Sequence, residues 1–289
     1  MGVLIALVPM VAWGSIGLVS GKIGGDANQQ TLGMTLGAWF FALCATLIVR
    51  PAISIETFFV GLAAGFLWSL GQNGQFKGMK QMGVATALPI STGLQLIVTT
   101  LIGVLAFHEW QTKRDYLFGI LALACLVLGS VLTSRQDPKR IAEAEHRLYN
   151  YGQGLRALLL STVGYAAYNA IINASGVEPL AVILPQATGM VLGAFIFAGR
   201  KIKIEKVVFY NMAAGLLWGI GNICMLSAMK LIGLAVSFSL SQSGILISTL
   251  GGIFILGEEK TKLELRYIIS GCLLVIGGVL LLGYLKAGV

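Results

Sequence analysis

The 289-residue sequence is strongly apolar, with 56% hydrophobic and 11% charged residues and a mean hydropathy of +0.85. Soluble domains have roughly 45–50% apolar and about 25% charged residues, so the composition excludes an ordinary soluble protein and predicts an integral membrane protein. The net charge of +8 does not indicate a nucleic-acid partner, because the basic residues lie between apolar runs and form no stripe with interleaved aromatic residues.

Ten apolar runs follow one another along the chain, each near the roughly 20 residues that cross a bilayer as a helix. Backbone groups in lipid must be paired within their own segment, so each run is expected to be an α-helix. The first run has no basic n-region and no A-x-A-like cleavage site after it, so we expect a first span and not a signal peptide. The expected spans are 2–20, 31–49, 56–76, 83–106, 115–134, 154–172, 179–199, 207–228, 234–256 and 265–285.

Basic residues are distributed unequally between the two sides that these spans define. Five lie on the side of the N-terminus and fifteen on the opposite side. By the positive-inside rule the fifteen face the cytoplasm, which predicts a multi-pass plasma-membrane protein with both termini outside. The one long polar stretch divides the chain into a first five-helix repeat (1–134), a cytoplasmic linker (135–153) and a second five-helix repeat (154–289).

The two halves of the chain resemble each other. FLWSLGQNGQFKGMKQMGVATA from Phe66 aligns with LLWGIGNICMLSAMKLIGLAVS from Leu216 at an offset of 150, which matches Trp68 with Trp218. QTLGMTLGAW from Gln30 aligns with QATGMVLGAF from Gln186 at an offset of 156. Because each copy has five spans, an odd number, the second copy must enter the membrane from the opposite face. Inverted repeats of this kind are typical of transporters that work by alternating access.

Four segments resemble a known family: WGSIGLVSGKIGG, ALPISTGLQL, LPQATGMVLGAF and FSLSQSGILISTLGGIFILGE. They are similar to bacterial glucose/ribose uptake porters of the drug/metabolite transporter superfamily, and the likeness runs nearly from end to end. The resemblance implies a ten-helix fold, uptake of a monosaccharide with glucose as the leading candidate, and proton coupling. Export of small metabolites or amino acids, as in other members of the superfamily, stays open because direction cannot be read from residues.

A sugar site needs neutral amide and hydroxyl partners together with aromatic walls. The same residues could instead form hydrogen bonds between helices, and the tryptophans could be plain core residues. Pro89 lies in the middle of a span, where it should kink the helix, and transporters often bind substrate at such a point. The candidate substrate-binding residues are Trp13, Trp68, Gln72, Asn73, Ser91, Gln95, Tyr165, Tyr168, Asn169, Gln186, Trp218, Asn222 and Gln242.

All twelve acidic residues lie in loops or at span ends. A cation antiporter normally needs a carboxylate at mid-depth, so a neutral substrate is favoured. The same distribution weakens proton coupling, for which Glu109 and Glu178 are the remaining candidates, and facilitated diffusion stays open. A membrane-embedded enzyme is disfavoured because His108 and His146 occur without an HExxH, GxSxG or Cys/His cluster. We expect no metal and no cofactor; the expected partners are a sugar and membrane lipid, and the oligomeric state is not indicated.

Overall fold

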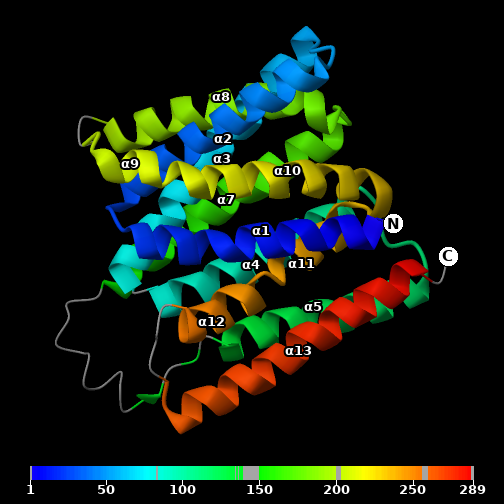
Figure 1. The fold of residues 1–289 in the computed structure, drawn as a ribbon. Coiled ribbons are helices and arrows are strands. Elements are labelled where there is room, and N and C mark those ends of the chain that lie inside the picture. Colours follow the sequence, from blue (N-terminus) through cyan, green and yellow to red (C-terminus); the bar gives the residue numbers. More distant parts are fainter. Residues whose placement is uncertain are drawn as a thin grey trace.

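The regular elements of the computed structural model are α-helices (Figure 1). The structure describes residues 2–82, 84–133, 135, 137–138, 150–199, 203–255 and 260–287, with the backbone alone at 80, 82, 84–86, 88–89, 252 and 286–287. The helices are α1 (Gly2–Ile23), α2 (Ala27–Val49), α3 (Ile55–Met82), α4 (Val84–Leu105), α5 (Lys113–Thr133), α7 (Tyr151–Ser175), α8 (Pro179–Ala198), α9 (Lys206–Tyr210), α10 (Met212–Ile232), α11 (Leu234–Gln242), α12 (Ile245–Phe254) and α13 (Lys262–Ala287).

Eight helical segments of the described chain are long and apolar enough to cross a membrane. Two of them join neighbouring helices, namely α9 with α10 over Lys206–Ile232 and α11 with α12 over Leu234–Gly251. The helices α3 and α4 cover the predicted runs 56–76 and 83–106, but neither is one of the eight. The described apolar part of α4 is the shorter stretch Ile90–Leu105. The protein is therefore an all-helical, multi-pass membrane protein.

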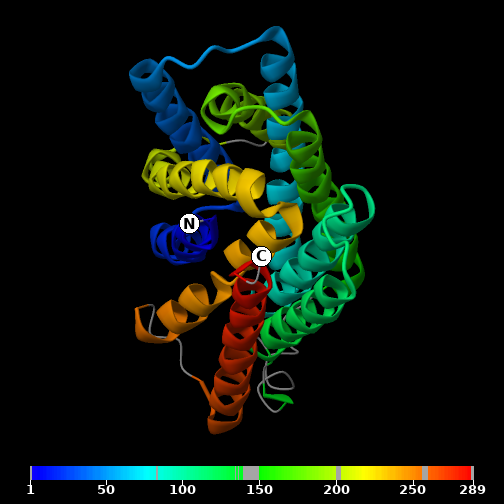
Figure 2. The ribbon, with the colours of Figure 1, turned by 90° about the vertical axis from the view of Figure 1, so that its right-hand side faces the viewer.

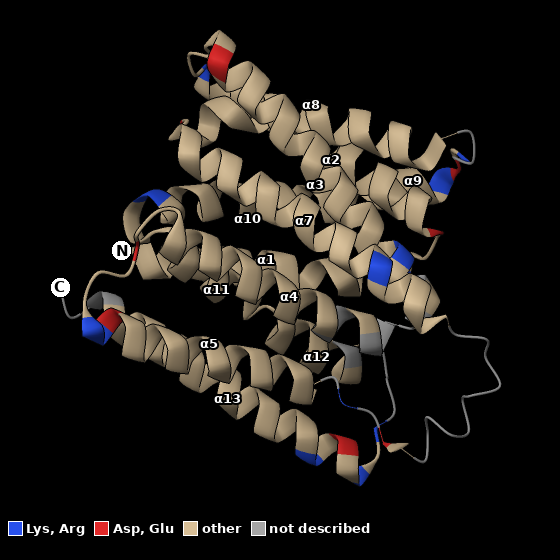
Figure 3. Ribbon diagram, turned by 180° about the vertical axis from the view of Figure 1, so that it is seen from behind, with Lys and Arg blue, Asp and Glu red and all other residues tan. Residues whose placement is uncertain are grey.

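Large apolar side chains cover the outside of the bundle. Ile48, Ile55 and Phe254 have 80% or more of their surface exposed, as lipid-facing residues should. In the described part of the chain, charged residues gather at the two ends of the helices and the middle of the bundle is uncharged (Figure 3). The N- and C-termini lie at the same end of the bundle (Figures 1 and 3), which we call the termini end.

Two predicted spans are interrupted, which the sequence did not indicate. Between α9 and α10 lies Asn211, which is fully buried and whose Nδ2 donates to the carbonyl oxygens of Gly24 (3.1 Å) and Val207 (2.9 Å). Between α11 and α12 lie Ser243 and Gly244. At Gly244 the backbone lies so close to α1 that a Cβ on Gly14 would collide with the carbonyl oxygen of Gly244, and a Cβ on Gly244 would collide with the carbonyl oxygen of Met10. Small residues thus let α1 pack directly against the break.

Helices from the two halves of the chain interlock. The helix α3 packs against α7 and α8, while α10 packs against α1 and α2. The helix α2 also contacts α8, and α4 contacts α11. The helices α5 and α13 pair at one edge of the bundle (Figure 2). The predicted linker 135–153, with His146, lies mostly outside the described residues. The side chain of Pro89 also lies outside them; the helical backbone of α4 runs through this position, and a functional kink there stays a prediction.

Candidate functional site

The aromatic candidates meet where α3, α7 and α10 come together. The rings of Trp68 and Trp218 are 5.4 Å apart between centroids and inclined by 63°, and the ring of Tyr165 lies 6.2 Å from that of Trp68. Both tryptophans are almost completely buried. The indole Nε1 of Trp13, which is half-buried on α1, donates to the carbonyl oxygen of Trp218 at 3.4 Å. The three predicted tryptophans therefore surround one region in the middle of the bundle.

A first chain of polar side chains crosses three helices beside these rings. The hydroxyl of Tyr168 on α7 donates to Oδ1 of Asn222 on α10 at 2.7 Å. Asn222 must then turn its Nδ2 toward Gln186 on α8, whose Oε1 accepts at 2.8 Å. Gln186 is fully buried, and its Nε2 has no hydrogen-bond partner among the residues that the structure describes. An unpaired buried donor costs about 1–3 kcal/mol, so Gln186 is the side chain best placed to donate to a bound solute.

A second polar chain joins α7, α3 and α4. The hydroxyl of Tyr165 lies 2.8 Å from Oε1 of Gln72 and 3.4 Å from Oε1 of Gln75. The Nε2 atoms of Gln75 and Gln95 both donate to Oγ of Ser91, at 2.8 and 2.9 Å. Four of these residues were predicted as candidates, but Gln75 was not. Its position one turn after Gln72 on α3 was the available signal, although the equivalent residue in the second repeat is the apolar Met225.

The other candidates lie apart from these two chains. Asn73 faces α2, where its Nδ2 donates to Oδ1 of Asn28 at 3.1 Å. Asn169 donates within its own helix to the carbonyl oxygen of Tyr165 at 2.9 Å. Gln242 is half-buried at the C-terminal end of α11, beside the break in that span. Asn73 and Asn169 therefore have local structural partners, whereas Gln186 has an open donor.

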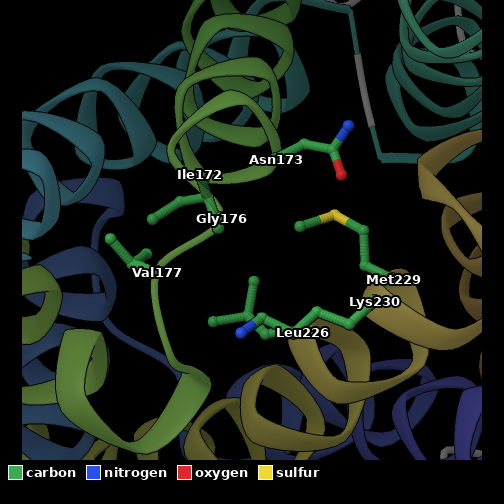
Figure 4. Close-up of a pocket in the computed structure, with 7 residues that line it drawn as sticks. All are labelled: Ile172, Asn173, Gly176, Val177, Leu226, Met229 and Lys230. Atoms are coloured by element: carbon green, nitrogen blue, oxygen red, sulfur yellow. The ribbon is translucent and has the colours of Figure 1, made fainter. Parts of the chain in front are cut away.

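A small cavity lies one helical turn from the first polar chain toward the termini end (Figure 4). Ile172 and Leu226, which line it, follow Tyr168 and Asn222 by four residues on α7 and α10. The cavity has a volume of about 20 Å³, which is room for roughly one water molecule and not for a sugar. Beside it Nζ of Lys230 forms an ion pair with Glu178 at 2.6 Å. At this end the polar centre is thus followed by a small cavity with a mostly apolar lining and by one partly exposed ion pair.

Glu109 makes a second polar contact at the termini end. Its carboxylate accepts hydrogen bonds from the backbone N–H groups of Leu234 (2.7 Å) and Ala235 (2.8 Å). These are the first two residues of α11, where the helix dipole favours a negative charge. Gly233 precedes them with a φ of +84° and packs against the same carboxylate. Glu109 therefore fixes the loop after α4 to the start of α11.

A larger groove of about 520 Å³ lies between α3 and α8 on the outside of the bundle. Its walls are formed by apolar side chains of both helices, and Phe59 and Ile196 among them are more than 60% exposed. Such a groove offers no side-chain hydrogen bond to a sugar. Its volume does not make it a substrate site, and the interior polar chains remain the candidate.

Comparison with known proteins places the chain in a family. The family described as "Sugar transport protein" matches residues 4–285. "Putative sugar uptake protein" of Enterococcus faecalis is 56% identical over 287 residues, covering 99% of this chain and all of that protein. "Putative sugar uptake protein M6_Spy1874" of Streptococcus pyogenes is 50% identical over 99% of each chain. A crystal structure of a protein 17% identical in sequence shares the fold, with a TM-score of 0.71 over 98% of each chain. The chain belongs to the sugar transport protein family.

Proposed function

We propose that this protein takes up a neutral monosaccharide, with glucose as the leading candidate, by alternating access. The observation that carries the proposal is the buried chain of Tyr168, Asn222 and Gln186, which ends on an unpaired amide donor beside the Trp68 and Trp218 rings. Amide and hydroxyl groups match sugar hydroxyls, and indole faces match the apolar face of the ring. The relatives named as sugar uptake proteins support the same substrate class.

The proposed architecture has ten spans in two inverted repeats, 1–134 and 154–289. The packing supports this view, because contacts of α3 with α7 and α8 have counterparts in those of α10 with α1 and α2. Trp68 and Trp218, equivalent residues of the two repeats, also touch each other. Two equivalent residues can touch only near the axis that relates the repeats. The proposed axis therefore passes through the candidate site, where inverted-repeat transporters bind substrate.

The proposed orientation puts the termini end outside the cell, since fifteen of the 20 basic residues fall on the other side. The ion pair Lys230–Glu178 and the residues around the small cavity then close the outer route to the site. Glu109 would also lie outside, at the start of α11. Glu109 and Glu178 are the groups we expect to carry a proton if sugar and proton move together, because no acidic residue lies in the middle of a span.

The proposal is tested by counterflow of radiolabelled glucose into proteoliposomes that contain the purified protein. Ribose, other monosaccharides, amino acids and a quaternary ammonium compound serve as competitors, and empty liposomes are the control. We expect competition by monosaccharides alone. Counterflow with and without an imposed pH gradient separates symport from facilitated diffusion. Sugar counterflow no greater than in empty liposomes would refute the assignment, and competition by amino acids would favour a metabolite transporter.

A further inference from the structure

Two buried oxygen atoms lack hydrogen-bond partners at the end of the bundle opposite the termini end, where α9 lies (Figure 1). They are Oγ of Ser20 on α1, a residue that is 5% exposed, and Oδ1 of Asn211, which is fully buried between α9 and α10. Neither atom has a partner among the residues that the structure describes. Native proteins rarely leave buried polar atoms unpaired, so such a pair of atoms indicates a bound water molecule or ion.

The packing of α1 on α10 brings the two atoms to nearly the same level. The two helices run in opposite directions (Figure 1), and Trp13 of α1 packs against Gly221 of α10. Antiparallel helices advance by equal steps in opposite directions, so Ser20 lies opposite residue 214. That position is within about one helical turn of Asn211. The two unpaired oxygens therefore belong to one place between α1 and the break in the eighth span.

A tight turn after α1 adds backbone oxygens to the same place. Gly24 and Gly25 have φ values of +82° and +101°, which residues with a Cβ rarely adopt. This turn presents the carbonyl oxygen of Gly24 to Nδ2 of Asn211 at 3.1 Å, and the same nitrogen donates to the carbonyl oxygen of Val207 at 2.9 Å. Reversing the amide would place Oδ1 against both carbonyl oxygens. The orientation of Asn211 is therefore fixed, and its Oδ1 is an acceptor without a donor.

Donors are scarce around these oxygens. Nε2 of Gln30 on α2 is shared between the carbonyl oxygens of Ser20 and Gly24, at 3.4 Å from each. The hydroxyl of Ser15 on α1 donates to the carbonyl oxygen of Val11 at 2.8 Å, whereas the hydroxyl of Ser20 forms no such bond. The dipole at the C-terminal end of a helix such as α1 favours a positive charge. In transporters with broken spans, helix ends and unwound carbonyl groups of this kind bind small cations.

We propose that this place binds one monovalent alkali cation, which fastens the C-terminal end of α1 to the break between α9 and α10. The ligand atoms are Oγ of Ser20, Oδ1 of Asn211 and the carbonyl oxygens of Gly24 and Val207. All four are uncharged, which suits a monovalent ion, since Ca²⁺ and Mg²⁺ sites normally include carboxylates. The charged residues nearby in the chain are exposed and of both signs, so solvent screens them: Lys22, Asp26, Lys203, Glu205 and Lys206. Binding of the ion does not depend on the transport function proposed above.

Thermal unfolding of the purified protein tests the site. The melting temperature is measured in the chlorides of sodium, potassium and choline at one ionic strength. Binding of radioactive sodium, and of rubidium in place of potassium, is measured by equilibrium dialysis. We expect sodium or potassium to bind saturably and to raise the melting temperature by roughly 2–4 °C at about five times the dissociation constant, because a ligand of the folded protein stabilises it. Choline is too large for the site and should give no rise.

Two serine variants on α1 place the ion. Ser20→Ala removes one ligand atom and breaks no other hydrogen bond of that side chain, so the melting temperature in choline should be equal to that of the parent or higher. The half-saturating cation concentration should rise by roughly tenfold or more, because contacts with a charged partner are strong. Ser15→Ala is the matched control, since its hydroxyl bonds only within α1, and it should leave the cation response unchanged.

The outcomes separate the cation site from the alternatives. Equal melting temperatures in the three salts, without saturable cation binding, would overturn the proposal and leave a buried water molecule between Ser20 and Asn211. A cation response that is the same in Ser20→Ala as in the parent would also overturn it, because the ion would then bind elsewhere. Absence of sugar counterflow would refute the transport function without changing either cation measurement, so the two failures are distinguishable.

Discussion

The substitution Gln186→Met tests the polar centre most directly. Methionine has nearly the length of glutamine, so it removes the unpaired Nε2 donor and the Oε1 acceptor without leaving a large cavity. Loss of the buried unpaired donor should stabilise the sugar-free protein by about 1–3 kcal/mol, and leaving Nδ2 of Asn222 without its acceptor should cost a similar amount. The two effects oppose each other, so the melting temperature should change little.

Sugar binding should change much more than stability. Without the amide of Gln186, a sugar hydroxyl would enter the buried site without a partner, which costs about 1–3 kcal/mol. That free energy corresponds to roughly a 5- to 150-fold rise in the half-saturating sugar concentration, since 1.4 kcal/mol is a factor of ten. The measurements are half-saturation in glucose counterflow and thermal unfolding of the purified protein.

The variant Thr162→Val is a matched control for Gln186→Met. Thr162 is also buried, but its hydroxyl bonds to the carbonyl oxygen of Leu158 within the same helix, so half-saturation should stay at the parent value. If Gln186→Met also leaves half-saturation unchanged while lowering the melting temperature, Gln186 only joins helices and the site assignment is refuted.

Two further substitutions test close packing and the Glu109 contact. Gly65→Ala should destabilise by about 1–3 kcal/mol, because its Cβ meets the backbone of Gln186. Gly17→Ala in α1 meets nothing within 4 Å and should leave thermal stability unchanged or higher; equal melting temperatures for the two variants would contradict the packing. Glu109→Gln should lower stability by about 0.5–2 kcal/mol, since it removes the charge that accepts two N–H groups at the start of α11. An unchanged unfolding transition would show that the carboxylate does not hold α11.

Hydropathy predicted where helices lie better than where they stop or break. The run 56–76 ends where polar residues begin, yet α3 continues to Met82, because a helix need not be apolar once it leaves the lipid. The breaks after Tyr210 and Gln242 fall at polar residues, but polar residues also occur inside unbroken helices, so hydropathy alone does not mark a break. At Asn211 the deciding contact is a hydrogen bond to Gly24, a residue 187 positions away in the chain. Such a contact depends on the tertiary arrangement and not on the local sequence.

The residue types at the site were easier to predict than the hydrogen bonds that they form with one another. Polar residues in the middle of spans must find partners, which is why Gln72, Asn222 and Gln186 could be singled out from the sequence. Which of them pair with each other depends on helix rotation and on depth in the bundle. Tyr168 bonds to Asn222 whereas Tyr165, one turn earlier on the same helix, bonds to Gln72. The sequence also gave no reason to separate Asn73, which bonds to Asn28, from the other candidates.

The amides at the centre would give the sugar a physical role in the proposed alternating access. A ligand shifts an equilibrium between two states only by the difference in its affinity for them. Any change of access that moves α8 away from α10 would separate Gln186 from Asn222, and two buried amides without partners would make the intermediate costly. Hydroxyls of a sugar bound between the two helices could replace the lost bond and remove that cost. An empty carrier would lack this compensation, so the uncharged amides at the centre would link movement of the helices to the presence of a neutral, hydroxyl-rich solute.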